Sequence, residues 1–345
     1  MIYSDMNYFK QRELDTLKKI DSHLSKLPPP CKHFFMGIEL TTSAQTRLAY
    51  IYDLKLFFEF LGSHVDEFIG KPFHSFTTSD LELVTALDVQ LFLQYVSVRS
   101  QKTKSETRIL TNSHIGKHRK LATLRSFFAY LFAQNMITKN IMPKIALPKL
   151  SEKPITRLDQ KEVAVLLDAP IERDEKTSVR DYTLLLFFLS TGIRVSELVG
   201  LNIGDINLSD KSFKVTRKGG KQAILYMTDE LHGQMQEYLE HLKETNTSMN
   251  KSSPLFCSRI NQRIGARSVQ LLVKKYASSA VPLKHITPHK LRSTFGTRLY
   301  RQTGDIYMVA EVLGHKDVNT TKKHYAAISE DIQRRAFEKL DIHGE

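Results

Sequence analysis

The chain has 345 residues, of which 41% are hydrophobic, so it is long enough for two domains with ordinary buried cores. Its formal net charge of +13 points to a polyanionic partner, and the longest apolar run, 184–189, is far too short to cross a bilayer. With no signal-peptide pattern and only two isolated cysteines, Cys31 and Cys257, the chain has no disulfide framework, and we expect a reducing, cytoplasmic setting.

Residues 1–40 carry a short amphipathic pattern. Apolar residues recur at Leu14, Leu17, Ile20 and Leu24, and three prolines at 28–30 follow as a breaker. The pattern predicts a short leading helix or arm.

Residues 41–147 predict a mostly helical domain. The first helix begins near Thr42, with hydroxyl side chains at 41–43 as capping candidates, and ends at Gly62. Its apolar side consists of Leu48, Ile51, Tyr52, Leu54, Phe57, Phe58 and Leu61. Two further helices are predicted at 80–98 and 114–132.

A dense series of basic residues lies between 99 and 125, against a single acid, Glu106. Such a run is usually only a solvated face, but serine, threonine and asparagine interleave with it, and these accompany lysine and arginine at phosphates. We interpret the run as a DNA-binding surface. Its members are Arg99, Lys102, Lys104, Arg108, Lys117, Arg119, Lys120 and Arg125.

A connector is predicted where the helical pattern stops. Residues 142–154 contain three prolines with interspersed lysines, which favours an extended linker, placed at 148–155. A second domain, 156–345, then begins with a helix over 156–169.

Arg194 directly follows a predicted buried helix that ends at Thr191 and Gly192. A guanidinium offers a rigid fork of donors that matches the oxygens of a phosphate, which lysine does not. Glu197 is placed to orient Arg194 or a catalytic histidine. The alternative is an ordinary surface ion pair, worth only about 0.3–0.5 kcal/mol.

Residues 213–227 predict two short strands with Gly219 and Gly220 at the turn. Lys218 would lie at the tip and Lys221 just beyond it. Lys218 would then be able to reach into a groove of DNA, and Lys221 is a candidate DNA-binding residue.

The stretch 289–325 gathers groups suited to a phosphodiester. His289 and Arg292 are three residues apart and share a helix face, and Gly314 is predicted to end a helix over 306–313 just before His315. Tyr325 is the candidate nucleophile. Because only about a thousandth of tyrosine is ionised at neutral pH, it needs a proton acceptor and positive charge nearby.

A metal site is disfavoured. Four histidines, at 285, 289, 315 and 324, share no metalloenzyme spacing with a carboxylate. We expect no metal and no other cofactor.

Five blocks stand in one order along this half of the chain: TGIRVSEL, RKGGK, HKLRSTFGTRLY, LGHKDVNTT and the final Tyr325. Together they resemble the tyrosine recombinase (phage integrase) family, over roughly residues 155–340. The resemblance implies a mainly α fold with a small β-sheet. A helical, SAM-like core-binding domain and an α+β catalytic domain would close as a C-shaped clamp on DNA.

The resemblance also implies chemistry: site-specific cutting and rejoining of DNA strands through a 3′-phosphotyrosyl intermediate and a Holliday junction. Arg194 and Arg292 would hold the non-bridging oxygens of the scissile phosphate, and His315 would add a hydrogen bond.

The remaining implied roles concern the nucleophile and the leaving group. Tyr325 would attack phosphorus while His289 assists removal of its proton. Lys218 matches the hairpin lysine that serves the family as general acid for the leaving 5′ hydroxyl, a role that typically contributes about 10²–10⁴-fold.

The tail repeats apolar residues at near-helical spacing, which predicts a helix over 327–341. The helix would either close its own domain or dock on a neighbouring subunit, as such a helix does in the resembling family, and we favour docking. We therefore expect a homotetramer on two double-stranded DNA sites at the nucleoid, formed from a free monomer or weak dimer, with a possible accessory protein.

Two features leave the subfamily open. Ser293 stands where many relatives have histidine, and His315 and Tyr325 are ten residues apart, one more than is typical of the chromosome-dimer-resolving Xer enzymes. Integrases of mobile elements therefore remain an option. Two other functions also stay open, a type IB topoisomerase-like DNA-relaxing enzyme and a non-catalytic site-specific DNA-binding protein.

Overall fold

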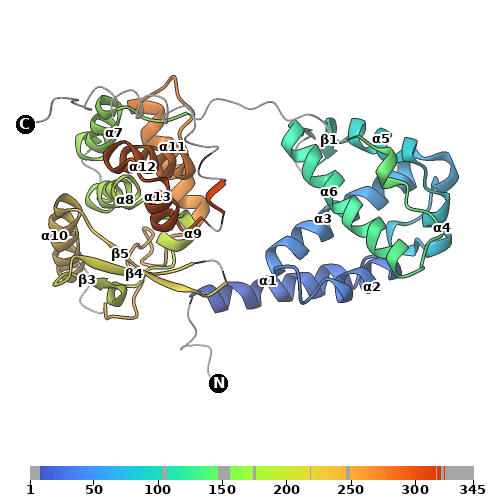
Figure 1. The fold of residues 1–345 in the computed structure, drawn as a ribbon, viewed down its shortest axis with the longest axis horizontal. Helices are drawn as coiled ribbons and strands as arrows, with labels where there is room; N and C mark the ends of the chain where they lie inside the picture. Colours follow the sequence, from blue (N-terminus) through green and yellow to red (C-terminus); the bar gives the residue numbers. More distant parts are fainter. Residues whose placement is uncertain are drawn as a thin grey trace, which may run out of the picture. The chain divides into compact units, whose positions relative to one another are not determined.

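A computed structural model of the chain describes residues 8–102, 107–146, 156–173, 176–217, 219–245, 249–315, 317–319 and 322. For residues 99–102 and 107–110 it describes the backbone only. The chain divides into two compact units, residues 1–152 and 153–345, with the division inside the proline-rich stretch (Figure 1). In the described residues no helix is long and apolar enough to cross a membrane.

The first unit is helical apart from one hairpin. Its helices are α1 (Tyr8–Leu24), α2 (Pro29–Gly37), α3 (Ala44–His64), α4 (Thr78–Leu83), α5 (Ala86–Tyr95) and α6 (His114–Ala133), and its strands are β1 (Val98–Lys102) and β2 (Thr107–Thr111). Short 3₁₀ turns lie at Asp66–Phe68, Phe73–Ser75 and Met142–Lys144.

The prolines at 28–30 separate α1 from α2, and they also mark the start of α2. Pro29 and Pro30 occupy the first turn of α2, where a missing backbone N–H costs nothing. Cys31 and Phe34 of α2 are fully buried in the same core as α3 and α6. The segment read as a leading helix or arm therefore contributes to the core of the first unit.

The sequence predicted that the first helix of this domain ends at Gly62, but α3 continues past that residue. The helix begins at Ala44, with Ser43 capping the backbone N–H of Thr46, and runs to His64. A Cβ at Gly62 would lie 2.3 Å from the carbonyl oxygen of Lys71. The glycine thus permits a close approach of the following loop.

The single helix predicted at 80–98 is wrong in two respects. It is split into α4 and α5 by Thr85, whose hydroxyl caps Asp88 N–H while the Asp88 carboxylate accepts from the Thr85 backbone. Its last predicted residue, Val98, instead opens β1 and pairs with Thr111 of β2. The helix predicted at 114–132 is confirmed as α6.

The second unit combines helices with a small sheet. Its helices are α7 (Gln160–Arg173), α8 (Ser178–Thr191), α9 (Val195–Leu198), α10 (Asp229–Thr245), α11 (Ala266–Ala280), α12 (Pro288–Thr303) and α13 (Ile306–Leu313). The strands β3 (Ile206–Asn207), β4 (Ser212–Thr216) and β5 (Gln222–Tyr226) form an antiparallel sheet in that order, after a 3₁₀ turn at Ile203–Asp205. The mainly α fold with a small sheet is thus confirmed.

Helix α8 is the centre of the second unit. It contacts α7, α10 and α12 (Figure 1). Residues 184–189 are all buried, so every side of this part of the helix is covered. A helix apolar on all sides is stable only when surrounded in this way. These neighbours hold the C-terminal end of α8 in place. They thereby also fix the position of the residues that follow it.

Candidate active site

The end of α8 positions Arg194. Gly192 caps the helix in the left-handed conformation, with φ of 62°. A Cβ there would lie 2.3 Å from Phe295 of α12 and 2.8 Å from Leu313 of α13, so only glycine fits. The loop that carries Arg194 is thereby pressed against two other helices.

Glu197 contacts both the side chain and the backbone of Arg194, as the sequence suggested. The carboxylate, only 4% exposed, accepts a 2.7 Å hydrogen bond from Arg194 Nη1 and a 3.0 Å bond from the Arg194 backbone N–H. The other terminal nitrogen, Nη2, donates to the carbonyl of Gly314 at 2.8 Å. About a third of the Arg194 side chain stays accessible to solvent.

Arg292 extends from α12 to the same place. It is 5% exposed and donates from Nη1 to the carbonyl of Gly192 at 2.6 Å and from Nη2 to the carbonyl of Leu313. The two predicted phosphate-binding arginines thus bind successive carbonyls, at residues 313 and 314.

His315 follows that turn immediately. Gly314, with φ of 60°, ends α13, and the backbone N–H of His315 donates to the carbonyl of Ala310 at 2.9 Å. The structure therefore brings Arg194, Arg292 and His315 together around one helix end, although they are far apart in the sequence. Two guanidinium groups with fixed orientations beside a histidine are suited to hold an anion.

His289 lies in the first turn of α12, one turn before Arg292, and its side chain is exposed. Ser293, which departs from the usual family residue, donates its hydroxyl to the carbonyl of His289 at 3.0 Å. The serine is thus engaged with its own helix. The role of His289 in removing the tyrosine proton stays a prediction.

Lys218 and Tyr325 lie outside the described residues, as does the tail over 327–341. The hairpin around Lys218 is confirmed. β4 and β5 pair from Ser212↔Tyr226 to Thr216↔Gln222, and Gly219 and Gly220 both have positive φ.

One residue at this site was missed by sequence reasoning. Arg217 donates from Nη2 to the carbonyl of Val312 at 2.8 Å and from Nη1 to that of Glu311 at 3.2 Å. The RKGGK block was read for its lysines, and nothing in the sequence shows that the neighbouring arginine faces α13.

The basic residues of α6 have internal partners. Arg119 forms a two-bonded ion pair with the buried Asp53, and half of its side chain is still exposed. Burial raises the pKa of Asp53, and the charge of Arg119 opposes that rise. Lys120 is 7% exposed with its ammonium on Asn112, and Arg125 donates to the carbonyl of Ile145.

The other predicted DNA-binding residues differ in setting. Lys117 is half-buried and bonds Ser97, while Lys221 is exposed beside the hairpin turn. Arg99, Lys102 and Arg108 belong to the hairpin β1–β2, which the sequence did not predict, and Lys104 lies outside the described residues.

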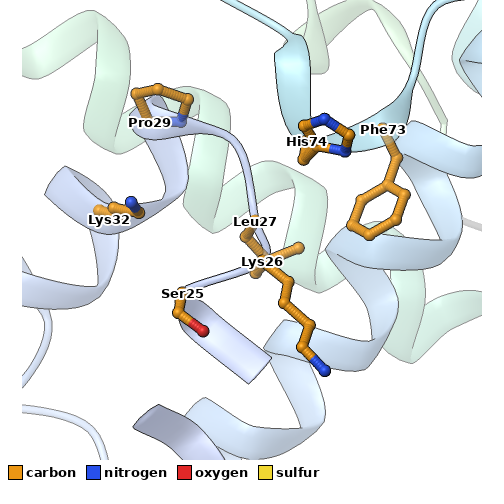
Figure 2. A pocket seen from close by; sticks show the side chains of 7 residues that line it. All are labelled: Ser25, Lys26, Leu27, Pro29, Lys32, Phe73 and His74. Carbon is orange, nitrogen blue, oxygen red and sulfur yellow. The ribbon is translucent and has the colours of Figure 1, made fainter. Parts of the chain in front are cut away.

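A separate hollow of about 410 Å³ lies in the first unit. Figure 2 shows Lys26 from the connection between α1 and α2 and Lys32 from α2, with Phe73 and His74 across from them. It contains none of the predicted catalytic residues. In the described part of the chain, no group of three or more histidine, cysteine or acidic side chains is placed to hold a metal ion.

Comparison with known proteins gives consistent results. Residues 156–331 match the profile described as the phage integrase family. A tyrosine recombinase XerC of Caldanaerobacter subterraneus subsp. tengcongensis is 32% identical over 344 residues, covering 96% of this chain and 90% of that protein. The XerC of Pelobacter propionicus is 31% identical, with coverage of 87% and 90%.

Solved structures share the fold at lower identity. The Tn1549 transposon integrase in complex with a circular intermediate DNA has a TM-score of 0.63 at 19% identity, covering 90% of this chain and 99% of that one. XerH bound to its difH substrate has a TM-score of 0.59 at 21% identity, with coverage of 85% and 78%. From the profile match and the relatives spanning nearly its whole length, the chain belongs to the phage integrase family, the tyrosine recombinases.

Proposed function

We propose that this site-specific DNA recombinase uses Tyr325 as its nucleophile and the helix-end site as its phosphate-binding site. The observation that carries the proposal is the convergence of Arg194 and Arg292 on the carbonyls of residues 313 and 314, directly before His315. Neither the topoisomerase-like nor the non-catalytic alternative is favoured by relatives that are tyrosine recombinases.

Arg194 and Arg292 offset the charge that develops on the non-bridging oxygens of the scissile phosphate, and His315 adds a hydrogen bond. Fixing both guanidinium groups before DNA arrives lowers the cost of reorganisation in the transition state. Burial of Glu197 supports this role of Arg194. The buried carboxylate orients the guanidinium and leaves its solvent-accessible side open to a phosphate.

The tyrosine hydroxyl attacks phosphorus, and the bond from phosphorus to the 5′ oxygen breaks. His289 assists removal of the tyrosine proton, and Lys218 protonates the departing 5′ oxygen. The product is a 3′-phosphotyrosyl link and a free 5′ hydroxyl. A 5′ hydroxyl from a partner duplex then attacks that link and rejoins the strands without an external energy source.

DNA binding is assigned to basic residues of both units, which would close as a clamp on the duplex. Phosphate contacts are supported best where a side chain retains exposed surface, as in Arg119 and Lys221. The remaining residues of the proposed DNA-binding surface are Arg99, Lys102, Lys104, Arg108, Lys117, Lys120 and Arg125.

We further propose assembly of four chains on two DNA sites, with the segment 327–341 docking on the neighbouring subunit. The biological outcome of the proposed reaction stays open between resolution of chromosome dimers and integration or excision of a mobile element. In both, strand exchange passes through a Holliday junction.

The proposed nucleophile is tested with a nicked suicide duplex, prepared from fragments flanking the gene, which traps covalent protein–DNA adducts. We expect an adduct that mass spectrometry places on Tyr325 and that is absent from Tyr325→Phe. Tyr307→Phe is the matched control, since Tyr307 is an exposed tyrosine of α13 and should leave the adduct unchanged. An adduct on another residue would contradict the proposal.

A further inference from the structure

Arg217 is the arginine of the β4–β5 hairpin that faces the active-site helix end. We propose that it is a positioning residue, which fastens the hairpin to α13 so that Lys218 is held at the leaving oxygen. The inference rests on the proposed function, because it concerns the general acid of that reaction. It assigns a role to a residue outside the catalytic set.

The fastening uses the last carbonyls of α13, of which that of Glu311 also accepts a 2.9 Å hydrogen bond from the Gly314 backbone N–H. The last carbonyls of a helix lack partners within it and carry partial negative charge, which attracts a cation. Arg217 donates to two of them, Val312 at 2.8 Å and Glu311 at 3.2 Å. A planar guanidinium is able to span two carbonyls in this way, whereas a lysine ammonium is a single point charge.

Gly314 makes room for this contact. A Cβ at Gly314 would lie 2.5 Å from Arg217 Nη1 and 2.7 Å from its Cζ, so the guanidinium lies directly against the glycine. The Arg217 Nε is buried and has no hydrogen-bond partner, which is the cost of this close packing. The guanidinium of Arg217 therefore packs into the turn at Gly314.

The rest of the described tip has little support. The Arg217 backbone N–H donates to the Lys221 carbonyl at 2.7 Å, and Gly220 N–H donates to the Arg217 carbonyl at 3.1 Å. These bonds close the turn upon itself. A Cβ at Gly219 or Gly220 would meet no heavy atom within 4 Å, so both glycines face open space.

Three arginines thus divide one helix end between them. Arg217 binds the carbonyls of Glu311 and Val312, Arg292 that of Leu313, and Arg194 that of Gly314. The hairpin is therefore attached to the same turn that orients Arg194 and Arg292, the two arginines proposed to bind the phosphate. Releasing Arg217 would misplace the proton donor while the grip on the phosphate remains.

A bridging-sulfur substrate separates these two effects. In ordinary DNA the departing 5′ oxygen needs a proton from Lys218. A 5′ thiolate, with a parent thiol pKa near 8.5, leaves without one. We expect Arg217→Met to cleave the oxygen substrate about 10- to 100-fold more slowly, as for a small misplacement of a catalytic group. Cleavage of the sulfur substrate should stay within about threefold of wild type, because the acid is no longer required.

Controls distinguish positioning from loss of stability. Lys218→Met, which removes the acid itself, should show a larger oxygen defect and the same recovery with sulfur. Arg263→Met is the matched control, since Arg263 also donates to two backbone carbonyls, those of Val199 and Leu201. It should alter the two substrates equally. Equal loss on both substrates by Arg217→Met, or wild-type cleavage of both, would overturn the proposal.

A second measurement needs no DNA. In Arg217→Met, hydrogen exchange of the tip amides over 217–221 should rise at least several-fold, while Arg217→Lys gives an intermediate increase. Unchanged exchange would overturn the fastening. Absence of any adduct with wild-type protein, or adduct formation by Tyr325→Phe, would instead contradict the proposed function, and exchange would still decide the role of Arg217.

Discussion

At the residue scale, each arginine of the candidate active site is oriented by hydrogen bonds to fixed protein groups. Arg194 is held on one side by a buried carboxylate and on the other by a backbone carbonyl. Arg292 has carbonyl partners on both sides and is itself buried. Charged donors bound to fixed acceptors lose little freedom when a phosphate arrives, so this orientation would contribute to the proposed catalysis.

Glu197 offers the clearest test at this scale. Glu197→Gln keeps the shape but weakens a charge-assisted bond, worth roughly 1.5–3 kcal/mol. Glu197→Ala leaves the Arg194 backbone N–H and guanidinium without their buried partner. We expect adduct formation to fall about tenfold for glutamine and further for alanine, with DNA affinity nearly unchanged.

The matched variant is Glu162→Gln, which disrupts a different ion pair of the same unit, with Lys284 at 2.6 Å. It should lower stability slightly and leave the rate of adduct formation intact. Equal rates for Glu197→Ala and wild type would show that Arg194 needs no support from Glu197.

At the element scale, left-handed glycines bring the helices together. Gly192, Gly304 and Gly314 end α8, α12 and α13. The ends of α8 and α13 meet through Arg194 and Arg292, the two arginines proposed to bind the phosphate. Each glycine therefore fixes where a helix stops, and two of them also fix how closely the next element approaches.

Gly192→Ala and Gly304→Ala form a matched pair, because both positions have positive φ but only one is crowded. A Cβ at Gly304 would meet no heavy atom within 4 Å, whereas one at Gly192 would collide with Phe295 and Leu313. We expect Gly304→Ala to cost about 1–2 kcal/mol of unfolding free energy from conformation alone. Gly192→Ala should cost roughly 1–3 kcal/mol more from overpacking.

Denaturant unfolding of both variants measures this difference. Gly192→Ala should also impair adduct formation beyond its effect on stability, since it displaces the loop that carries Arg194. Similar unfolding free energies for the two variants would contradict the close packing.

At the scale of the whole molecule, two compact units carry charge for one polyanionic partner. The net charge of +13 is distributed over both, with basic residues on α6 of the first unit and Lys221 in the second. Attraction to phosphates acts through released counterions, so it depends on salt. Assembly through the tail, in contrast, would act only after DNA is bound.

Two variants should therefore have opposite effects. Lys221→Ala should reduce the slope of log affinity against log salt by about 0.9, the value for one lost phosphate contact, and still permit strand exchange. Deletion of residues 327–345 should leave the slope unchanged and abolish strand exchange. Loss of DNA binding in the truncated chain would place the tail within its own domain instead.

The sequence by itself determined the helical character of most of the chain, the β4–β5 hairpin and the identity of the catalytic candidates. These features depend on local chemistry: the fully apolar stretch 184–189, the glycine pairs and the side-chain types needed for phosphate. The prediction that failed at Gly62 depended on which neighbour a residue meets, whereas the one at 80–98 missed a local signal, the capping box of Thr85 and Asp88. A glycine serves equally as a helix end or as a close contact, and only the position of Lys71 distinguishes the two at Gly62.

Only the tertiary structure decided how the site is held together. Arg194, Arg217 and Arg292 come from three separate segments, and no pattern in the sequence shows that all three bind the carbonyls of residues 311–314. Backbone carbonyls exist at every residue, so a sequence does not mark which of them a side chain will find. The packing of α8, α12 and α13 exposes one helix end to three guanidinium groups, and that geometry selects the partners.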